Sequence, residues 1–284
     1  MGEGLLRLTD LVEYHQGAKA DMCRPSGQFC FTELPYFIFF RGEGMDIYKK
    51  LDAAKYLSGN EYPGRGVLLG TSPSGKAVLA YFIMGRSDNS RNRVFRLQGD
   101  DVMIFPYDES KVEDPSLIIY APVRTEGLQT IVTNGDQTDT ILSHLRAGGS
   151  FETALETRCF EPDAPNLTPR ISGILHMGKA DFTYELSILK SADAEGTACN
   201  RYYYRYAALP GLGHLIHTYE ENGNPIPTFQ GEPRRMDVPE DLEAFTKTLW
   251  ENLNEQNRIS LYVRYTDPVT GQYEARLVNK YGKD

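Results

Sequence analysis

The sequence predicts a protein of mixed α and β structure, in which antiparallel sheets carry helices on their outer surfaces. Two predicted hairpins indicate the antiparallel sheets. Apolar stretches 67–70 and 77–84 flank a turn signal at residues 72–75, and stretches 259–265 and 273–278 flank another at 267–271. A helical repeat of apolar side chains from Leu242 to Leu253 indicates an outer helix that covers a sheet.

The remaining elements follow from the same two periodicities. Apolar repeats predict helices at residues 5–12, 47–57, 138–146 and 151–159. Gly59 is expected to end the second of these helices, and Ser150 is expected to cap the start of the last one. Apolar runs predict strands at residues 94–98, 101–105, 116–123, 130–133, 171–177 and 183–190. The last helix is expected to begin near Pro239, because a first helical turn tolerates its missing N–H.

Composition and charge indicate a packed globular protein that does not bind nucleic acid. The chain has 284 residues, 40% hydrophobic and 24% charged, which fits one large domain with or without an extension. Its net charge of −9 argues against non-specific binding to nucleic acid, which depends on neutralising phosphates. A few arginines focused in a cleft can still bind a small anion on an acidic protein.

The cysteines and the apolar runs favour a cytoplasmic protein. The four cysteines, at 23, 30, 159 and 199, form no CxxC pair, which argues against a zinc site and fits a reducing compartment. The N-terminus has no apolar core behind basic residues, so we expect no signal peptide. The apolar run 36–40 is too short to cross a bilayer, so we expect no membrane partner.

A cluster of arginines and small polar residues follows the predicted strand 77–84. Arg86, Ser87, Arg91 and Arg93 all lie within residues 85–93. Guanidinium groups offer a fixed fork of donors that matches phosphate oxygens, and serine hydroxyls can complete such a shell. The pattern fits a phosphate-binding turn, and it also fits a solvated turn with charged side chains.

Polar residues also stand where the predicted strand 130–133 gives way to a helix. Asn134, Gly135 and Thr138 lie at this junction. A helix start presents free N–H groups, so the junction could bind an anion or a ribose. The same residue types serve as turn and capping residues, and that reading is favoured by the local pattern alone.

Acidic residues also precede the start of the predicted strand 171–177. Glu161 and Asp163 come shortly before Arg170, which opens the predicted strand 171–177. Carboxyl groups in a pocket can transfer protons, whereas on the surface they would form an ion pair of little energy with the arginine.

His214 and His217 have the spacing of metal ligands on a helix. The flanking residues favour a strand, on which the two rings would point to opposite faces. With no third ligand at a suitable spacing, the sequence favours a protein without a metal site.

Taken together and in this order, these segments resemble the archaeal-type IMP cyclohydrolase family. The resemblance spans roughly residues 62–175. Each motif is short, but their joint order and spacing are specific. The motifs are Tyr62-Pro63-Gly64-Arg65, Gly85-Arg86-Ser87 with Asn92-Arg93, Tyr120 within 119–124, Asn134-Gly135-Asp136-Gln137-Thr138 and Thr168-Pro169-Arg170.

The resemblance implies an α+β fold, a four-layered αββα sandwich of antiparallel sheets like that of N-terminal-nucleophile hydrolases. It implies a family domain at residues 62–284 and leaves residues 1–61 as an N-terminal extension packed on that core.

The resemblance also implies the last step of purine synthesis, in which 5-formamidoimidazole-4-carboxamide ribonucleotide closes to IMP and loses water. By motif position the catalytic residues are Arg93, Tyr120 and Glu161. The substrate-binding residues are expected to be Arg86, Ser87, Asn134, Gly135, Thr138 and Arg170. The scheme needs no metal or other cofactor, its partner is a small purine ribonucleotide, and a homo-oligomer is compatible with it.

Several alternatives stay open. The segment before Arg93 is longer than in the archaeal pattern, so Arg91 could take its place, and Asp163 rivals Glu161 because the spacing to Thr168 differs slightly. A noncatalytic nucleotide-binding or regulatory module of the same fold is a second reading. Amide hydrolysis by an N-terminal nucleophile is disfavoured, because neither position 2, a glycine, nor Tyr62 offers a Ser, Thr or Cys.

Overall fold

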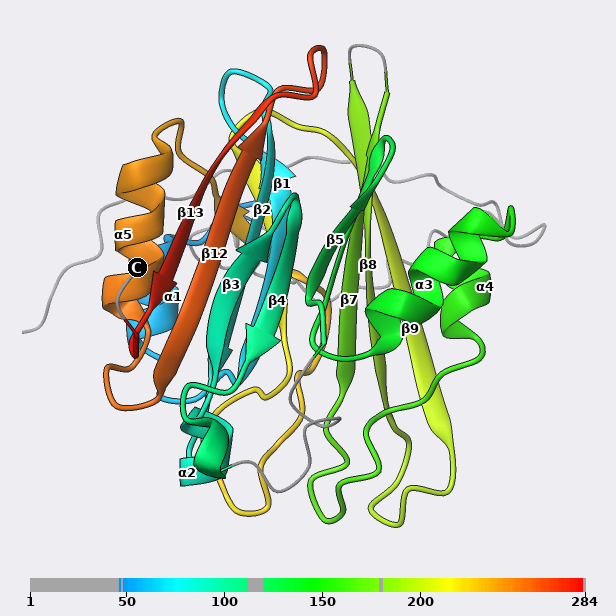
Figure 1. Ribbon diagram of the computed structural model, residues 1–284, viewed down its shortest axis with the longest axis vertical. Coiled ribbons are helices and arrows are strands. Elements are labelled where there is room, and N and C mark those ends of the chain that lie inside the picture. The colour runs from blue at the N-terminus through cyan, green and yellow to red at the C-terminus, as the bar shows by residue number, and fades with distance from the viewer. Residues whose placement is uncertain (1–45, 47, 112–119, 179–180, 283–284) are drawn as a thin grey trace, which may run out of the picture. The chain divides into compact units, whose positions relative to one another are not determined.

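Two antiparallel sheets lie face to face at the centre of the protein (Figure 1). The computed structural model describes residues 46, 48–111, 120–178 and 181–282. The first sheet has the strand order β11-β10-β1-β2-β12-β13. These strands are β1 (Arg65–Thr71), β2 (Ala77–Met84), β10 (Leu212–His217), β11 (Arg234–Asp237), β12 (Arg258–Thr266) and β13 (Tyr273–Asn279).

The second sheet has the order β3-β4-β5-β6-β7-β8-β9, so each strand pairs with its neighbour in sequence. These strands are β3 (Val94–Gln98), β4 (Asp101–Phe105), β5 (Val123–Glu126), β6 (Gln129–Thr133), β7 (Arg170–Met177), β8 (Phe182–Ser191) and β9 (Cys199–Ala207).

Helices cover the outer face of each sheet (Figure 1). Helices α1 (Ala53–Ser58) and α5 (Leu242–Asn252) pack on the six-stranded sheet, and α3 (Gln137–Arg146) and α4 (Phe151–Leu155) pack on the seven-stranded sheet. The short helix α2 (Asp88–Arg91) and a 3-10 turn (Glu109–Lys111) lie in connections. The described chain is therefore an α+β protein.

The apolar core is divided by the two sheets. One cluster, which includes Leu79, Tyr81, Phe95, Val132 and Leu186, fills the space between them, and two further clusters lie beneath the helices. Strand β2 is buried at every position, because one of its faces meets the other sheet and the other face meets α5. This explains why residues 77–84 form a continuous apolar run rather than an alternating one.

Most predicted elements are confirmed. The β1–β2 and β12–β13 hairpins form at the predicted turns, Gly59 follows α1, and the Ser150 hydroxyl accepts a hydrogen bond from the Thr153 N–H at the start of α4. No helix in the described part of the chain is long and apolar enough to cross a membrane.

Several predicted boundaries were wrong. Helix α5 begins at Leu242 instead of near Pro239, because the Asp241 carboxylate accepts a hydrogen bond from the Ala244 N–H at 2.8 Å and sets the start. Helix α1 begins at Ala53 for the same reason, with Asp52 as its N-cap. Helix α4 ends at Leu155, four residues earlier than predicted.

The strand predicted at 116–123 was wrong at residues 120–122, which form no strand. Within the described residues the strand of this region, β5, starts at Val123, while 112–119 lie outside them. The helix predicted at 5–12 falls outside them too. The compact unit that holds the sheets begins at Asp46, and Ala53 and Leu57 of α1 pack in the cluster beneath α5.

Candidate active site

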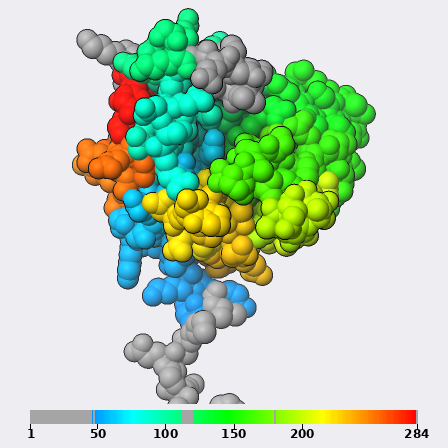
Figure 2. Space-filling view, turned by 90° about the horizontal axis from the view of Figure 1, so that it is seen from below, coloured from blue at the N-terminus to red at the C-terminus, as the bar shows by residue number. Residues whose placement is uncertain are grey.

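Four polar side chains gather at one end of the space between the sheets. Arg65 opens β1, Arg93 precedes β3, Tyr120 precedes β5, and Tyr81 lies on β2. The Tyr81 and Tyr120 hydroxyls are 3.5 Å apart, and the Tyr120 hydroxyl donates to the Asn134 carbonyl at 2.8 Å. Seen from this end, the cyan and green segments that supply the site lie side by side, although they are far apart in the chain (Figure 2). The sheet topology therefore unites residues that the sequence separates.

Glu161 completes this cluster with a carboxyl group. It lies near enough to Arg65, Arg93 and Tyr120 for their charges to affect one another. Burial raises the pKa of the Glu161 carboxyl above its usual value, although Arg65 and Arg170 oppose that shift. Such a carboxyl group exchanges its proton closer to neutral pH than an exposed glutamate does.

The two arginines carry more positive charge than their surroundings balance. Burial and the nearby charge of Arg65 lower the pKa of Arg93, although a guanidinium stays protonated in proteins. The buried Nε atoms of Arg65 and Arg93 have no hydrogen-bond partner among the described residues. Buried donors without an acceptor are costly, so Arg65 and Arg93 are suited to donate hydrogen bonds to the oxygens of a ligand.

The strand start that carries Arg65 depends on a glycine. Gly64 has φ +78°, and a Cβ at this position would lie 2.2 Å from the Thr218 Oγ1. The Thr218 hydroxyl instead accepts a hydrogen bond from the Arg65 N–H at 3.1 Å. From the sequence, Arg65 was only part of the Tyr62-Pro63-Gly64-Arg65 motif and had no predicted role. A glycine directly before an arginine at a strand start was the available signal.

The structure separates the two candidate acids. Asp163 accepts hydrogen bonds from the Thr168 N–H at 2.7 Å and from the Thr168 hydroxyl at 2.5 Å, so it holds its own loop together. The Glu161 side chain makes no hydrogen bond within the described residues, while its N–H donates to the Thr168 carbonyl at 2.9 Å. Asp163 therefore positions the loop, and Glu161 is the carboxyl group that stays available.

The structure also separates the arginines of residues 85–93. Arg91 donates to the Gly85 carbonyl and to the Asn257 side chain, both at 3.1 Å, whereas Arg93 lies in the cluster. Arg86 is exposed at the rim, where it bonds to Asn222 at 2.7 Å and lies 4.9 Å above the Tyr62 ring. Ser87 caps α2 and is exposed.

The residues at the end of β6 make internal contacts. The Asn134 amide donates to the Pro169 carbonyl and accepts from the Ile171 N–H, both at 2.9 Å, which joins the ends of β6 and β7. The Thr138 hydroxyl lies 2.6 Å from that of Thr133. Arg170 donates to Asp136 and Gln137 at 2.8 and 2.7 Å, and a Cβ at Gly135 would lie 2.6 Å from its guanidinium. These residues hold the wall from which Tyr120 and Glu161 project.

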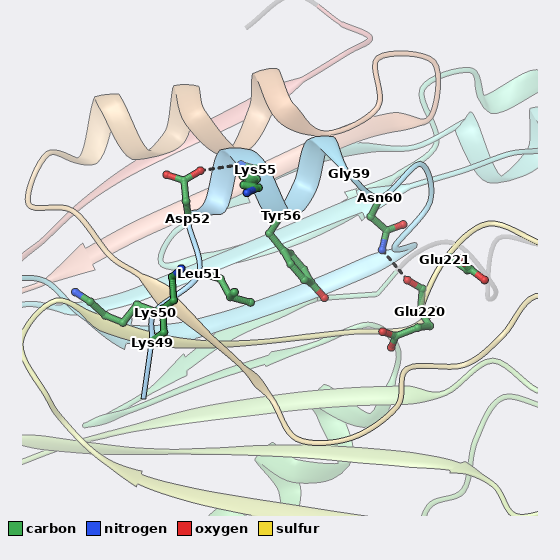
Figure 3. A pocket seen from close by; sticks show the side chains of 10 residues that line it. All are labelled: Lys49, Lys50, Leu51, Asp52, Lys55, Tyr56, Gly59, Asn60, Glu220 and Glu221. Carbon is green, nitrogen blue, oxygen red and sulfur yellow. Dashed lines mark hydrogen bonds between the residues drawn. The ribbon is translucent and has the colours of Figure 1, made fainter. Parts of the chain in front are cut away.

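A cavity of about 600 Å³ lies apart from the cluster, beside α1 (Figure 3). Tyr56 extends into this region from α1, and Glu220 and Glu221 face it from the segment after β10 (Figure 3). The arginine cluster does not line it. We place the candidate site at the cluster, because it brings two buried guanidinium Nε donors, without partners among the described residues, next to an available carboxyl group.

Tyr56 connects α1 to a buried histidine. The Nδ1 of His217 lies 2.8 Å from the Tyr219 carbonyl, which can only accept, so Nδ1 carries the proton and Nε2 is the acceptor. The Tyr56 hydroxyl, 2.7 Å from Nε2, is therefore the donor, and it accepts in turn from the Arg234 Nε at 3.3 Å.

Replacing Tyr56 by phenylalanine is expected to lower the free energy of unfolding by about 1–3 kcal/mol, because Nε2 of the buried His217 loses its donor. Urea unfolding of the variant measures this change. Tyr48→Phe is the matched control, since Tyr48 is 71% exposed. Equal losses in the two variants would contradict the hydrogen-bond assignment.

The two histidines of β10 are expected to make stability fall in mild acid. Burial lowers the pKa of His214 and of His217 to about 4, from 6.5 for a free ring. Between these values the unfolded chain binds protons that the folded chain does not, so stability is lost as the pH falls from 6.5 towards 4.

Each histidine ring lowers the free energy of unfolding by about 1.4 kcal/mol for each pH unit in this range. The raised pKa of Glu161 has the opposite effect on stability, which rises as the pH falls through that pKa. This effect comes from one group, whereas the loss comes from two histidines. Urea unfolding at pH 7 and pH 5, together with ring chemical shifts, measures the effect. Rings that titrate near pH 6.5 would show that these environments are wrong.

The two histidines also point to opposite faces, as the sequence predicts for a strand. The His214 Nδ1 lies 2.7 Å from the Tyr184 hydroxyl on the seven-stranded sheet, whereas His217 faces α1. No cluster of three or more His, Cys, Asp or Glu side chains suited to a metal ion is found in the part of the chain that the structure describes.

The fold and the site define a class of protein: an α+β protein with a cationic, phenol-lined site between two sheets, suited to a small anionic ligand. The family profile described as IMP cyclohydrolase-like protein matches residues 62–272. The chain belongs to this IMP cyclohydrolase-like family.

Three archaeal relatives, each named IMP cyclohydrolase, match parts of the chain. The Methanopyrus kandleri protein is 28% identical over 181 residues, which cover 60% of this chain and 89% of the relative. The Methanococcus aeolicus protein is 30% identical over 127 residues, covering 43% and 62% of the two chains. The Methanocella arvoryzae protein is 31% identical over 118 residues, covering 40% and 57%. The match thus spans less than two thirds of the length of two of these relatives.

Proposed function

We propose that this protein is an IMP cyclohydrolase, which closes 5-formamidoimidazole-4-carboxamide ribonucleotide to IMP with loss of water. The observation that carries the proposal is the group formed by Arg65, Arg93, Tyr120 and Glu161 between the sheets, in which the buried Nε atoms of both arginines lack a hydrogen-bond partner among the described residues. Family membership and the names of the archaeal relatives support the same reaction.

The reaction needs three things from the protein. The carboxamide nitrogen must be held against the formyl carbon, since positioning alone can supply several kcal/mol. As the new C–N bond forms, the nitrogen loses a proton and the formyl oxygen gains negative charge. That oxygen then takes up protons and leaves as water, so the site also needs a cation and a proton carrier.

The cluster offers a group for each task. Arg93, with Arg65 beside it, stabilises the charge on the formyl oxygen. Tyr120 orients the reacting groups and relays a proton, because its hydroxyl is fixed on the Asn134 carbonyl. Glu161 transfers the proton, since burial raises its pKa towards the working range.

The nucleotide's phosphate and ribose are assigned to the rim and wall of the cluster. Arg86 is the exposed guanidinium at the rim, and Arg170 lies close to Glu161. In this proposal Ser87, Asn134, Gly135 and Thr138 shape the substrate-binding wall. Their backbone N–H groups, and the side chains of Ser87, Asn134 and Thr138, are held in hydrogen bonds within caps and strand ends. The ligand is a purine ribonucleotide.

The same proposal includes the finer architecture. We assign the fold to the four-layered αββα sandwiches that resemble N-terminal-nucleophile hydrolases, with residues 62–284 as the family domain. Support comes from the order of the core clusters, in which helices, sheet, sheet and helices alternate with apolar layers.

Incubation of the purified protein with the formamido ribonucleotide tests the proposal. IMP formation, followed by ultraviolet absorbance and chromatography, is the expected result. Binding of the nucleotide without conversion would favour a noncatalytic nucleotide-binding or regulatory module instead. The absence of both binding and conversion would overturn the proposed ligand.

A further inference from the structure

A second cavity, of about 230 Å³, lies at the end of the sheets opposite the candidate active site. The strand register fixes this placement, because Arg65 pairs with Ile83 at one end of the β1–β2 hairpin, whereas Thr71 pairs with Ala77 at the other. Ala77 in turn pairs with Thr266, which lines the second cavity. The β12–β13 turn beside it is at the top of Figure 1, and α2, beside the active site, is at the bottom.

Arg264 places a buried positive charge at this cavity. Its residue is only 4% exposed, and its side chain reaches from β12 in one sheet to the Thr125 hydroxyl on β5 in the other. The guanidinium lies 3.8 Å above the Tyr273 ring. None of the ion pairs among the described residues includes Arg264. Buried charges are costly unless they are paired, and the Tyr273 ring balances this one only in part.

The hydrogen bonds of Arg264 leave an excess of donors. Its Nε donates to the Thr266 hydroxyl at 3.1 Å and its NH1 donates to the Thr125 hydroxyl at 3.0 Å. Each hydroxyl oxygen is thus an acceptor, so its own O–H remains free to donate. A guanidinium has five N–H donors, and these hydrogen bonds use two of them. The buried Tyr262 hydroxyl, two residues before Arg264, lies near the guanidinium and has no partner of good hydrogen-bond geometry among the described residues.

We propose that this cavity binds a small oxyanion, a carboxylate or a phosphate, between Arg264 and the hydroxyls of Thr125 and Thr266. An oxyanion supplies acceptors and a negative charge to Arg264, which forms no ion pair within the described residues, and a guanidinium fork matches its geometry. The site does not depend on the proposed ring closure, because it shares no residue with the Arg93 cluster. Its walls are otherwise mainly apolar, with contributions from Leu128, Met177, Pro268 and Val269.

The rim of the cavity contains one opposing charge. Asp100 lines the cavity, and its carboxylate accepts a hydrogen bond from the Tyr273 hydroxyl at 2.7 Å. Asp100 is exposed, so solvent screens its repulsion of a bound anion more than it screens the attraction of buried Arg264. The site therefore favours a small anion seated at the guanidinium over a larger one that reaches the rim.

Calorimetric titration with inorganic phosphate and with acetate, at constant ionic strength in chloride, tests this site. The candidate active site is cationic too, so the titration is made in an Arg93→Met background as well as in the unchanged protein. We expect a binding event that persists in Arg93→Met and weakens at least tenfold when Arg264→Gln is added. Arg276→Gln on the neighbouring strand is the matched control and is expected to bind as before.

Each outcome decides the proposal. Binding to phosphate but not acetate, or the reverse, identifies which oxyanion the cavity selects. The second site is overturned if the binding heat is lost in Arg93→Met and is the same with and without Arg264→Gln. All anion binding would then belong to the active site. If Arg264→Gln does not fold, selenate-soaked crystals of the unchanged protein decide. An anomalous peak within hydrogen-bond distance of Arg264 supports the site, and its absence there overturns it.

Discussion

Replacing Arg93 by methionine is expected to reduce kcat for ring closure by about 10²–10³-fold, the usual cost of removing a charge-stabilising donor from a transition state. Methionine keeps an apolar stem in the half-buried position and removes only the guanidinium. We expect the free energy of unfolding to stay the same or rise, because Arg93 lies near Arg65 and its Nε is buried without a partner. Initial rates of IMP formation and urea unfolding measure the two effects.

Arg91→Met provides the matched control two residues away. Arg91 is bonded to Gly85 and Asn257, outside the cluster, so its loss is expected to lower stability modestly and to leave kcat nearly unchanged. The opposite pattern, with a large loss of kcat in Arg91→Met and little in Arg93→Met, would transfer the role to Arg91. Near-normal turnover in both variants would remove guanidinium groups of this segment from the mechanism.

The hairpins of the fold could be predicted because their signals are local. The turn at 72–75 and the turn at 267–271 each stand between two apolar runs, and turn chemistry fixes the pairing of the strands that flank them. The start of α5 was missed because Pro239 and Asp241 both suit a helix start. Only the hydrogen bond that the Ala244 N–H donates to the Asp241 carboxylate decides between them.

The active-site cluster could be predicted only in part, because its geometry depends on contacts distant in sequence. Arg93 and Tyr120 were assigned through motifs, but Arg65 gained importance only when β1 was placed beside β10 and near Glu161. Polar side chains at the end of a strand also form hydrogen bonds with backbone groups. Asn134 and Thr138 do so here, and sequence alone does not distinguish that use from ligand binding.

Replacing Glu161 by glutamine is expected to lower kcat by about 10²–10⁴-fold, the range for removing a proton-transfer group. The pH profile gives a sharper test. Burial raises the pKa of Glu161, so the limb of the profile that reports this group should lie above the pH at which an exposed glutamate titrates. If Glu161 accepts the proton, the rate rises with pH through that pKa, and the limb is absent in Glu161→Gln. An unchanged limb in the variant would assign it to another group.

Asp163→Asn separates proton transfer from positioning, because the two acids have different partners. An asparagine keeps one acceptor for Thr168 but loses the charge that strengthens both hydrogen bonds, so we expect lower stability by about 1–2 kcal/mol. The Asp163→Asn enzyme should retain a pH limb, because a loosened loop still presents an ionisable Glu161. That limb should lie at lower pH than in the parent and with a reduced plateau, since the charge of Asp163 helps to raise the pKa of Glu161. If the limb is lost in Asp163→Asn but kept in Glu161→Gln, Asp163 is the proton carrier. The carboxylate of Glu161, which has no hydrogen bond within the described residues, would then have no role in catalysis.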